Sequence, residues 1–212
     1  MLSVKRVLSI VSSATATYIY ARALHTVFVR DANSVVVTSY GGHLQFLTIL
    51  TLFASLLRQI TCFLYSISGI RSLNALQSWL GILTTPIEVI VTMLYWPLKI
   101  YKNGLVKDNR FGLVIDPELD RMCHLYPAIF EFITSTALCT RKWPRGNIIP
   151  FLVFSAVSGG YWLWFETTFK HNGFYPYPLL AILDTQKKAI LIGCCTIVAF
   201  LTYKLVLAFQ RK

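Results

Sequence analysis

Two apolar stretches of the sequence carry side chains that together supply the chemical parts of a hydrolytic site. Thr48 lies near the start of one stretch, and His124 lies near the start of another. A threonine hydroxyl is a useful nucleophile only when a base removes its proton, and a neutral imidazole can do this and then protonate the leaving group. Asp120 precedes His124 by four residues, so on a helix its carboxylate could bond one ring nitrogen and fix the tautomer. These residue types match the nucleophile, base and orienting roles of a triad.

The positions of Thr48 and His124 along the chain favour a meeting between them. Their stretches are the second and fourth apolar stretches, so they cross a membrane in the same direction. Counted from expected helix starts near Leu44 and Leu119, Thr48 lies about four residues and His124 about five residues inward, which at ~1.5 Å per residue is roughly 6–8 Å below one interface.

The same residues also have an ordinary structural interpretation. A threonine in a membrane helix commonly bonds its own backbone, and a single histidine commonly serves packing. Pro127 follows His124 by three residues, removes an amide hydrogen and frees the Cys123 carbonyl. A local opening of the helix there would suit a site, and a kink needed only for packing explains it equally well.

Three further ionisable side chains fall inside apolar stretches, where they are costly and usually functional. They are Arg58, Glu88 and Glu131. Spacings of three and four residues place Arg58 on the helix face of Thr48, and spacings of four and seven place Glu131 on the face of His124. We therefore predict an intramembrane polar network. The alternatives are an Arg58 that snorkels to an interface and carboxyl groups that are protonated or paired for packing.

Six apolar stretches are long enough to position these side chains across a bilayer, since a span needs about 20 residues. They cover residues 7–29, 44–67, 79–100, 119–138, 148–169 and 188–209. The first is interrupted by Arg22 and His25, and it lacks the apolar core and cleavage site of a signal peptide. The sequence thus predicts an all-α fold, a polytopic membrane helix bundle of about six transmembrane helices, as one domain over residues 1–212.

Composition agrees with a membrane protein. The chain of 212 residues is 55% hydrophobic and 14% charged, with a mean hydropathy of +0.58, whereas soluble domains carry roughly 25% charged residues. The net charge of +11 comes from Lys and Arg in short connectors that suit anionic headgroups, so we expect no nucleic-acid partner. Basic residues on the side of the two termini favour cytoplasmic termini. The five cysteines show no C-x-x-C spacing, and we expect no metal site and no cofactor.

Three segments, in order, resemble the androgen-induced protein / androgen-dependent TFPI-regulating protein family. Residues 40–48 read Y-G-G-H-L-Q-F-L-T and are similar to its Y-G-G-x-x-K-F-L-T segment. Residues 119–124 read L-D-R-M-C-H and are similar to its L-N-H-x-x-H segment. Residues 164–167, W-F-E-T, followed by Tyr175-Pro176 or Tyr177-Pro178, are similar to its F-E-T and Y-P stretch.

This resemblance implies an endoplasmic-reticulum membrane protein that hydrolyses esters between a fatty acid and a hydroxy fatty acid. The substrate would be a lipid entering from the bilayer. The family's threonine nucleophile and its histidine fall on Thr48 and His124. The sequence departs from the family at Arg121, which replaces a histidine, at Asp120, which replaces an asparagine, and at Gln45, which replaces a lysine. These departures bear on the substrate more than on the chemistry.

Two other interpretations remain open. In the first, the chain is a non-catalytic multi-pass membrane protein that binds lipid, acts as a scaffold or transports a substrate along the polar residues Arg58, Glu88 and Glu131. In the second, haem is held between His43 and His124, which requires paired histidines at one depth, although His43 lies in a connector.

Overall fold

The computed structural model describes residues 3–30, 34–106, 116–138 and 140–210, and every regular element in these ranges is helical. The elements in chain order are α1 (Val4–Arg30), α2 (Val35–Thr38), η1 (Gly42–Gln45), α3 (Leu47–Ser68), α4 (Arg71–Lys102), η2 (Asn103–Leu105), α5 (Pro117–His124), α6 (Tyr126–Ile133), the π-helical turn η4 (Thr134–Leu138), α7 (Ile148–Asn172), α8 (Pro178–Ile182) and α9 (Thr185–Phe209).

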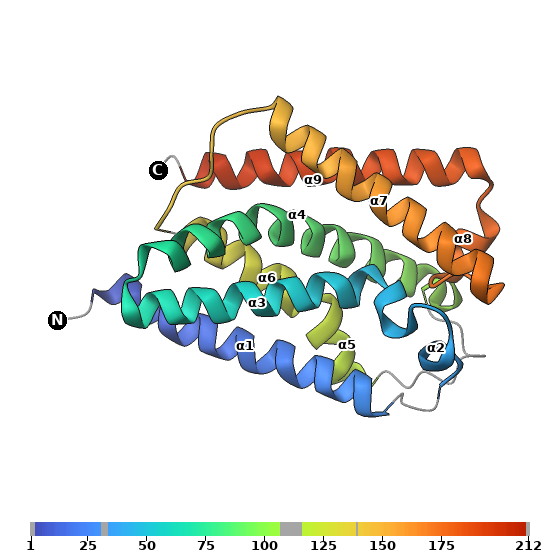
Figure 1. The fold of residues 1–212 in the computed structure, drawn as a ribbon, viewed down its shortest axis with the longest axis horizontal. Coiled ribbons are helices and arrows are strands. Elements are labelled where there is room, and N and C mark those ends of the chain that lie inside the picture. The colour runs from blue at the N-terminus through green and yellow to red at the C-terminus, as the bar shows by residue number, and fades with distance from the viewer. Residues whose placement is uncertain (1–2, 31–33, 107–115, 139, 211–212) are drawn as a thin grey trace.

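The long helices form a bundle in which both chain ends lie at the same end (Figure 1). Helix α1 packs on α3, α3 packs on α4, α4 packs on α9, and α9 packs on α7. Helices α5 and α6 lie against both α1 and α4. The short elements α2 and α8 lie at the opposite end from the termini.

The predicted all-helical membrane bundle is confirmed, and the number of spans remains approximate. Within the described residues, four helices are long and apolar enough to cross a membrane: Leu47–Ser68, Arg71–Leu105, Ile148–Asn172 and Thr185–Phe209. Helix α1 covers the first predicted span, residues 7–29. It contains basic residues in its first turn and in its last third. The fourth predicted span is a run of shorter pieces, α5, α6 and η4, rather than one helix.

Helix α4 starts at Arg71, well before the predicted start at residue 79. The added turns contain Gln77 and Ser78, which are polar yet buried against neighbouring helices. Hydropathy along the chain cannot distinguish a polar side chain that faces a protein interior from one that lies in a connector. The helix also continues through Pro86 and Pro97.

A buried ion pair joins α3 to α6. The side chain of Arg58 is fully buried, and its guanidinium contacts the equally buried carboxylate of Glu131. The guanidinium also donates to the Thr85 hydroxyl at 3.0 Å, the Ser135 hydroxyl at 2.7 Å and the Gln77 carbonyl at 3.2 Å. Since a buried charge is tolerated only when it is paired and hydrogen-bonded, this cluster fixes the positions of three helices.

The predicted network of Arg58, Glu88 and Glu131 is found as two separate groups in the structure: Arg58 pairs with Glu131, and Glu88 bonds elsewhere. Glu131 also accepts hydrogen bonds from Thr84 and, at 2.7 Å, from Gln59. Glu88 instead accepts a hydrogen bond from Ser55 at 2.9 Å. Within the described residues, no hydrogen bond or ion pair joins Glu88 to Arg58 or Glu131. Arg58 does not snorkel to an interface, because its charge is neutralised inside the bundle.

The missing side chain of Gly81 provides the space for the Arg58 guanidinium. A Cβ atom on Gly81 would lie 2.6 Å from Cζ of Arg58. We expect Gly81→Ala to destabilise the protein by about 1–3 kcal/mol, because overpacking must displace a hydrogen-bonded charge. Thermal unfolding of purified protein in detergent measures the effect. Gly193→Ala is the matched control, since a Cβ there meets open space; equal stabilities of the two variants would contradict this account.

Candidate functional site

The segment before α3 turns sharply and delays the start of that helix. Gly41 has φ +83° and Gly42 has φ +48°, a region that favours glycine. A Cβ on Gly41 would also approach Trp164 at 3.2 Å and Thr168 at 3.3 Å. The 3₁₀ turn η1 follows, and α3 begins at Leu47 rather than near residue 44.

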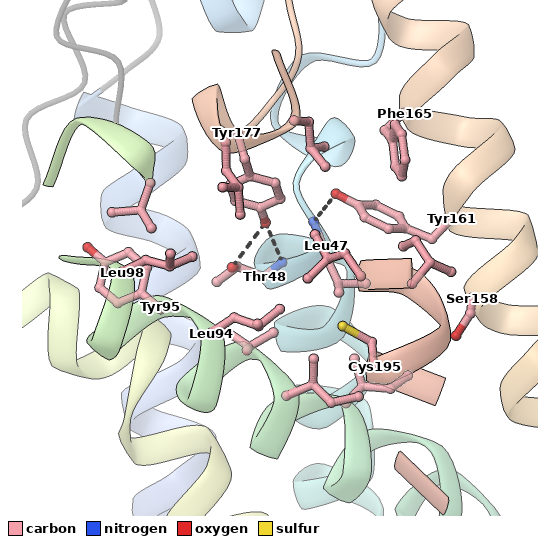
Figure 2. Close-up of a pocket in the computed structure, with 18 of the residues that line it drawn as sticks. Leu47, Thr48, Leu94, Tyr95, Leu98, Ser158, Tyr161, Phe165, Tyr177 and Cys195 are labelled. Carbon is pink, nitrogen blue, oxygen red and sulfur yellow. Dashed lines mark hydrogen bonds between the residues drawn. The ribbon is translucent and has the colours of Figure 1, made fainter. Parts of the chain in front are cut away.

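Two phenols satisfy the first backbone amides of α3. The first amides of a helix have no partner within it, and the N-cap residue Phe46 offers no side-chain hydrogen bond. The Leu47 N–H donates to the Tyr161 hydroxyl at 3.1 Å, and the Thr48 N–H donates to the Tyr177 hydroxyl at 3.4 Å (Figure 2). A tyrosine from α7 and a tyrosine from the connector before α8 thus cap one helix.

The hydroxyl of Thr48 differs from those of the later threonines of α3. Thr51 donates to the Leu47 carbonyl, and Thr61 donates to the Leu57 carbonyl, each one turn back along the helix. Thr48 lies in the first turn, and its Oγ1 lies 3.4 Å from the Tyr177 hydroxyl instead. Thr51 and Thr61 therefore bond their own helix backbone, as a threonine in a membrane helix commonly does, whereas Thr48 bonds Tyr177.

Thr48 lines a largely apolar pocket. The pocket lies between α4, α7 and α9, beside the start of α3, with η2 and α8 contributing residues near the connectors. Its polar lining residues are Thr48, Tyr95, Ser158, Tyr161 and Tyr177. Figure 2 shows Thr48 and Tyr177 beside the aliphatic side chains of α4. The lining suits an apolar ligand whose polar group lies at Thr48.

His124 is held by Asp120, as the sequence predicted from their spacing. The ring Nδ1 lies 2.9 Å from Asp120 Oδ1 and 3.1 Å from the Asp120 carbonyl oxygen. Both of these atoms are acceptors, so Nδ1 carries the hydrogen and Nε2 of the neutral ring keeps its lone pair. Lys99 pairs with the other oxygen of Asp120, an interaction that the sequence analysis missed.

The helix opens at His124, close to where Pro127 predicts it. Leu125, with φ −130° and ψ −56°, separates α5 from α6. The carbonyl of His124 receives new partners from α4. It accepts hydrogen bonds from the Thr92 hydroxyl at 2.7 Å and from the Trp96 Nε1–H at 3.1 Å, which fix the break against α4.

Thr48 and His124 lie on helices that pack together. Helix α3 packs on α5, yet within the described residues no hydrogen bond joins the two side chains. The His124 ring stacks on Tyr95 with ring centroids 3.5 Å apart and an interplanar angle of 2°. Tyr95 itself lines the pocket with Thr48. One aromatic ring of α4 thus touches both the imidazole and the pocket.

The predicted helix starts near Leu44 and Leu119, from which equal depth was counted, differ from the observed starts at Leu47 and Pro117. Thr48 is the second residue of α3 and His124 is the last residue of α5, so they are not at equal counts from their helix starts. The glycine turn and η1 delay the start of α3, whereas the Asp116 N-cap starts α5 earlier than expected. Of the two histidines considered for haem, His43 packs against Phe28, whereas His124 packs against Tyr95.

The two Tyr-Pro pairs have different partners. Tyr175 bonds the Glu166 carboxylate at 3.0 Å and contacts Lys188, which links α7 to α9. Tyr177 reaches Thr48. Tyr177, Tyr161, Tyr95 and Lys99 are the candidate site residues that spacing did not reveal; for Tyr177, its place in the Y-P stretch was the available signal.

Comparison with known proteins identifies the family. The family described as FAR-17a/AIG1-like protein matches residues 6–211. The chain belongs to the FAR-17a/AIG1-like family. A Schizosaccharomyces pombe protein named as a UPF0641 membrane protein is 32% identical over 165 residues, covering 78% of this chain and 74% of the yeast protein. No solved structure matches the chain. The family resemblance of the three sequence segments is thus confirmed, and this FAR-17a/AIG1-like chain is a membrane protein.

In this FAR-17a/AIG1-like protein, the tautomer of His124 depends on Asp120. We expect Asp120→Asn to weaken the Nδ1–H tautomer, because an amide can also donate a hydrogen bond to Nδ1. Nitrogen NMR shifts of the labelled histidine rings measure the tautomer, and His124→Gln assigns the signal. An unchanged His124 signal in the Asp120→Asn variant would show that the backbone carbonyl alone sets the tautomer.

Proposed function

We propose that this protein is a membrane-embedded lipid ester hydrolase with Thr48 as nucleophile and His124 as base. The observation that carries the proposal is the Thr48 hydroxyl, which lines an apolar pocket and is not bonded to its own helix. The substrates are fatty-acid esters of hydroxy fatty acids or similar lipids, as the family resemblance implies. The acyl chain would enter the pocket from the bilayer.

The surroundings of His124 suit a base. Asp120 holds Nδ1–H and leaves Nε2 able to accept a proton. Lys99 pairs with the other oxygen of Asp120 and so holds this carboxylate in place. The mechanism requires Nε2 to approach the Thr48 hydroxyl, directly or through one water, when substrate is bound; catalytic hydrogen bonds often tighten only at that stage.

The location that fits this proposal is the endoplasmic reticulum. The family resemblance supports it, and the two chain ends lie together at one end of the bundle (Figure 1). We propose that this end is cytoplasmic, because basic residues near it suit that side. The lipid ester would then be bound from within the bilayer at the opposite end, beside the connectors.

The first test replaces the proposed nucleophile and base. We expect Thr48→Ala and His124→Ala each to lower hydrolysis of a fatty-acid ester of a hydroxy fatty acid at least 100-fold, since removing either member of such a unit costs most of the acceleration. Thr61→Ala is the matched control, because Thr61 is a buried threonine of α3 whose hydroxyl bonds only the helix backbone. Full activity of either test variant, correctly inserted and purified, would remove this mechanism. Labelling of Thr48 by a fluorophosphonate provides an independent measurement.

A second candidate function is non-catalytic lipid binding, scaffolding or transport by the same fold. The pocket is almost entirely apolar, and Thr48 and His124 are not hydrogen-bonded to each other, which favours this alternative. An absence of fluorophosphonate labelling in folded protein would support it over hydrolysis.

Occupancy of the pocket by an acyl chain can be tested for either function. The lining residues Leu191 to Ala199 of α9 extend about 12 Å at ~1.5 Å per residue, so Ala199 lies deep in the pocket relative to the connectors. We expect Ala199→Phe to weaken binding of palmitate much more than binding of butyrate, measured by native mass spectrometry or competition with a fluorescent fatty acid. Leu201→Phe, on an exposed position of the same helix, is the control. Equal palmitate binding by both variants would place the chain elsewhere.

A further inference from the structure

Tyr177 contacts both the backbone N–H and the side-chain hydroxyl of Thr48, the proposed nucleophile. Its hydroxyl oxygen accepts the Thr48 N–H at 3.4 Å and lies 3.4 Å from Thr48 Oγ1 (Figure 2). In hydrolases with a hydroxyl nucleophile, the backbone N–H of that same residue commonly stabilises the oxyanion of the tetrahedral intermediate. The phenol of Tyr177 is therefore close enough to this N–H to serve as a second donor to the oxyanion.

We propose that Tyr177 is a further catalytic residue, whose phenol O–H and the Thr48 N–H together donate hydrogen bonds to the oxyanion. This inference rests on the proposed function. In the free protein, the phenol oxygen occupies the acceptor position of the Thr48 N–H. In the intermediate, the oxyanion takes that position and also accepts the Tyr177 O–H.

Acylation of Thr48 passes through a tetrahedral intermediate. Thr48 Oγ forms a bond to the ester carbonyl carbon, the π electron pair moves to the carbonyl oxygen, and the Thr48 hydroxyl proton passes to His124. The oxyanion then re-forms the carbonyl, the bond to the alcohol oxygen breaks, and His124 protonates the departing alcohol. Water repeats the sequence on the acyl-threonine, which releases the fatty acid and restores Thr48.

The two capping phenols are not equivalent. The Tyr161 hydroxyl donates to the Gln45 carbonyl at 3.1 Å and accepts the Leu47 N–H, so its proton is already committed to the backbone. The Tyr177 hydroxyl lies beside the reacting oxygen instead. Tyr177 is in a connector, where burial raises the pKa of its phenol, so the group is a protonated donor at neutral pH.

The Tyr177 ring is held in place before any substrate binds. It packs edge-on against Phe46, with ring centroids 5.6 Å apart and an interplanar angle of 79°. Pro176 and Pro178 flank it and restrict the backbone. These contacts keep the phenol beside Thr48, and its hydroxyl must shift away from the Thr48 N–H to admit the oxyanion.

The experiment compares Tyr177→Phe with Tyr175→Phe. We expect Tyr177→Phe to lower kcat about 100-fold with little change in KM, the typical loss for one oxyanion donor. It should also slow fluorophosphonate labelling of Thr48, because the phosphonyl oxygen uses the same donors. Tyr175→Phe removes the phenol of the other Tyr-Pro pair, which contacts Glu166 and Lys188 and does not line the pocket, so we expect only a few-fold change in kcat.

A purely structural role would give a different result. Equal losses of kcat in the two variants, or wild-type kcat in Tyr177→Phe, would overturn the inference. If Tyr177→Phe is unstable, difluorotyrosine at position 177 retains the ring and lowers the phenol pKa. The alkaline limb of the kcat profile should then move to lower pH, and an unchanged profile would also overturn the inference.

The outcomes separate this inference from the proposed function. Loss of activity in Thr48→Ala together with full activity in Tyr177→Phe removes only the role of Tyr177. Full activity in Thr48→Ala removes both the proposed function and the role of Tyr177.

Discussion

The first turn of α3 has backbone amides that its own helix cannot satisfy, and the candidate site is built around this constraint. The turn at Gly41 and Gly42 prevents the helix from starting earlier, and no N-cap side chain serves the amides. Tyr161 and Tyr177 supply the missing acceptors from segments far along the chain. The same hydrogen bonds close the bundle at this end and place polar groups beside Thr48 in an otherwise apolar pocket.

The ion pair of Arg58 and Glu131 holds the helices that carry this site. A guanidinium inside an apolar bundle is tolerated only where every donor finds a partner, and α4, α6 and η4 each provide some of these partners. Gly81 leaves the space for it. The cluster thus fixes the relative positions of α3 and α4, from which Thr48 and Tyr95 reach the pocket.

The interruption at Leu125 gives His124 a defined environment. A continuous helix would have used the His124 carbonyl within its own backbone, whereas here Thr92 and Trp96 of α4 bond it. Asp120 fixes the ring from one side and Tyr95 covers its face. The imidazole is therefore positioned by α4 and α5 together, and the aromatic ring of Tyr95 connects it to the pocket.

The sequence by itself determined the helical membrane fold, because long apolar stretches need internal backbone hydrogen bonding, and it determined the Asp120 and His124 contact, because four residues make one helical turn. It did not reveal that Glu88 bonds Ser55 while Arg58 pairs with Glu131, since spacing gives a face but not its partner. Only the tertiary structure brought Tyr177 to Thr48, across more than half of the chain. Local sequence patterns indicate which residues of one helix share a face. Contacts between segments that are distant in sequence depend on how all the helices pack together.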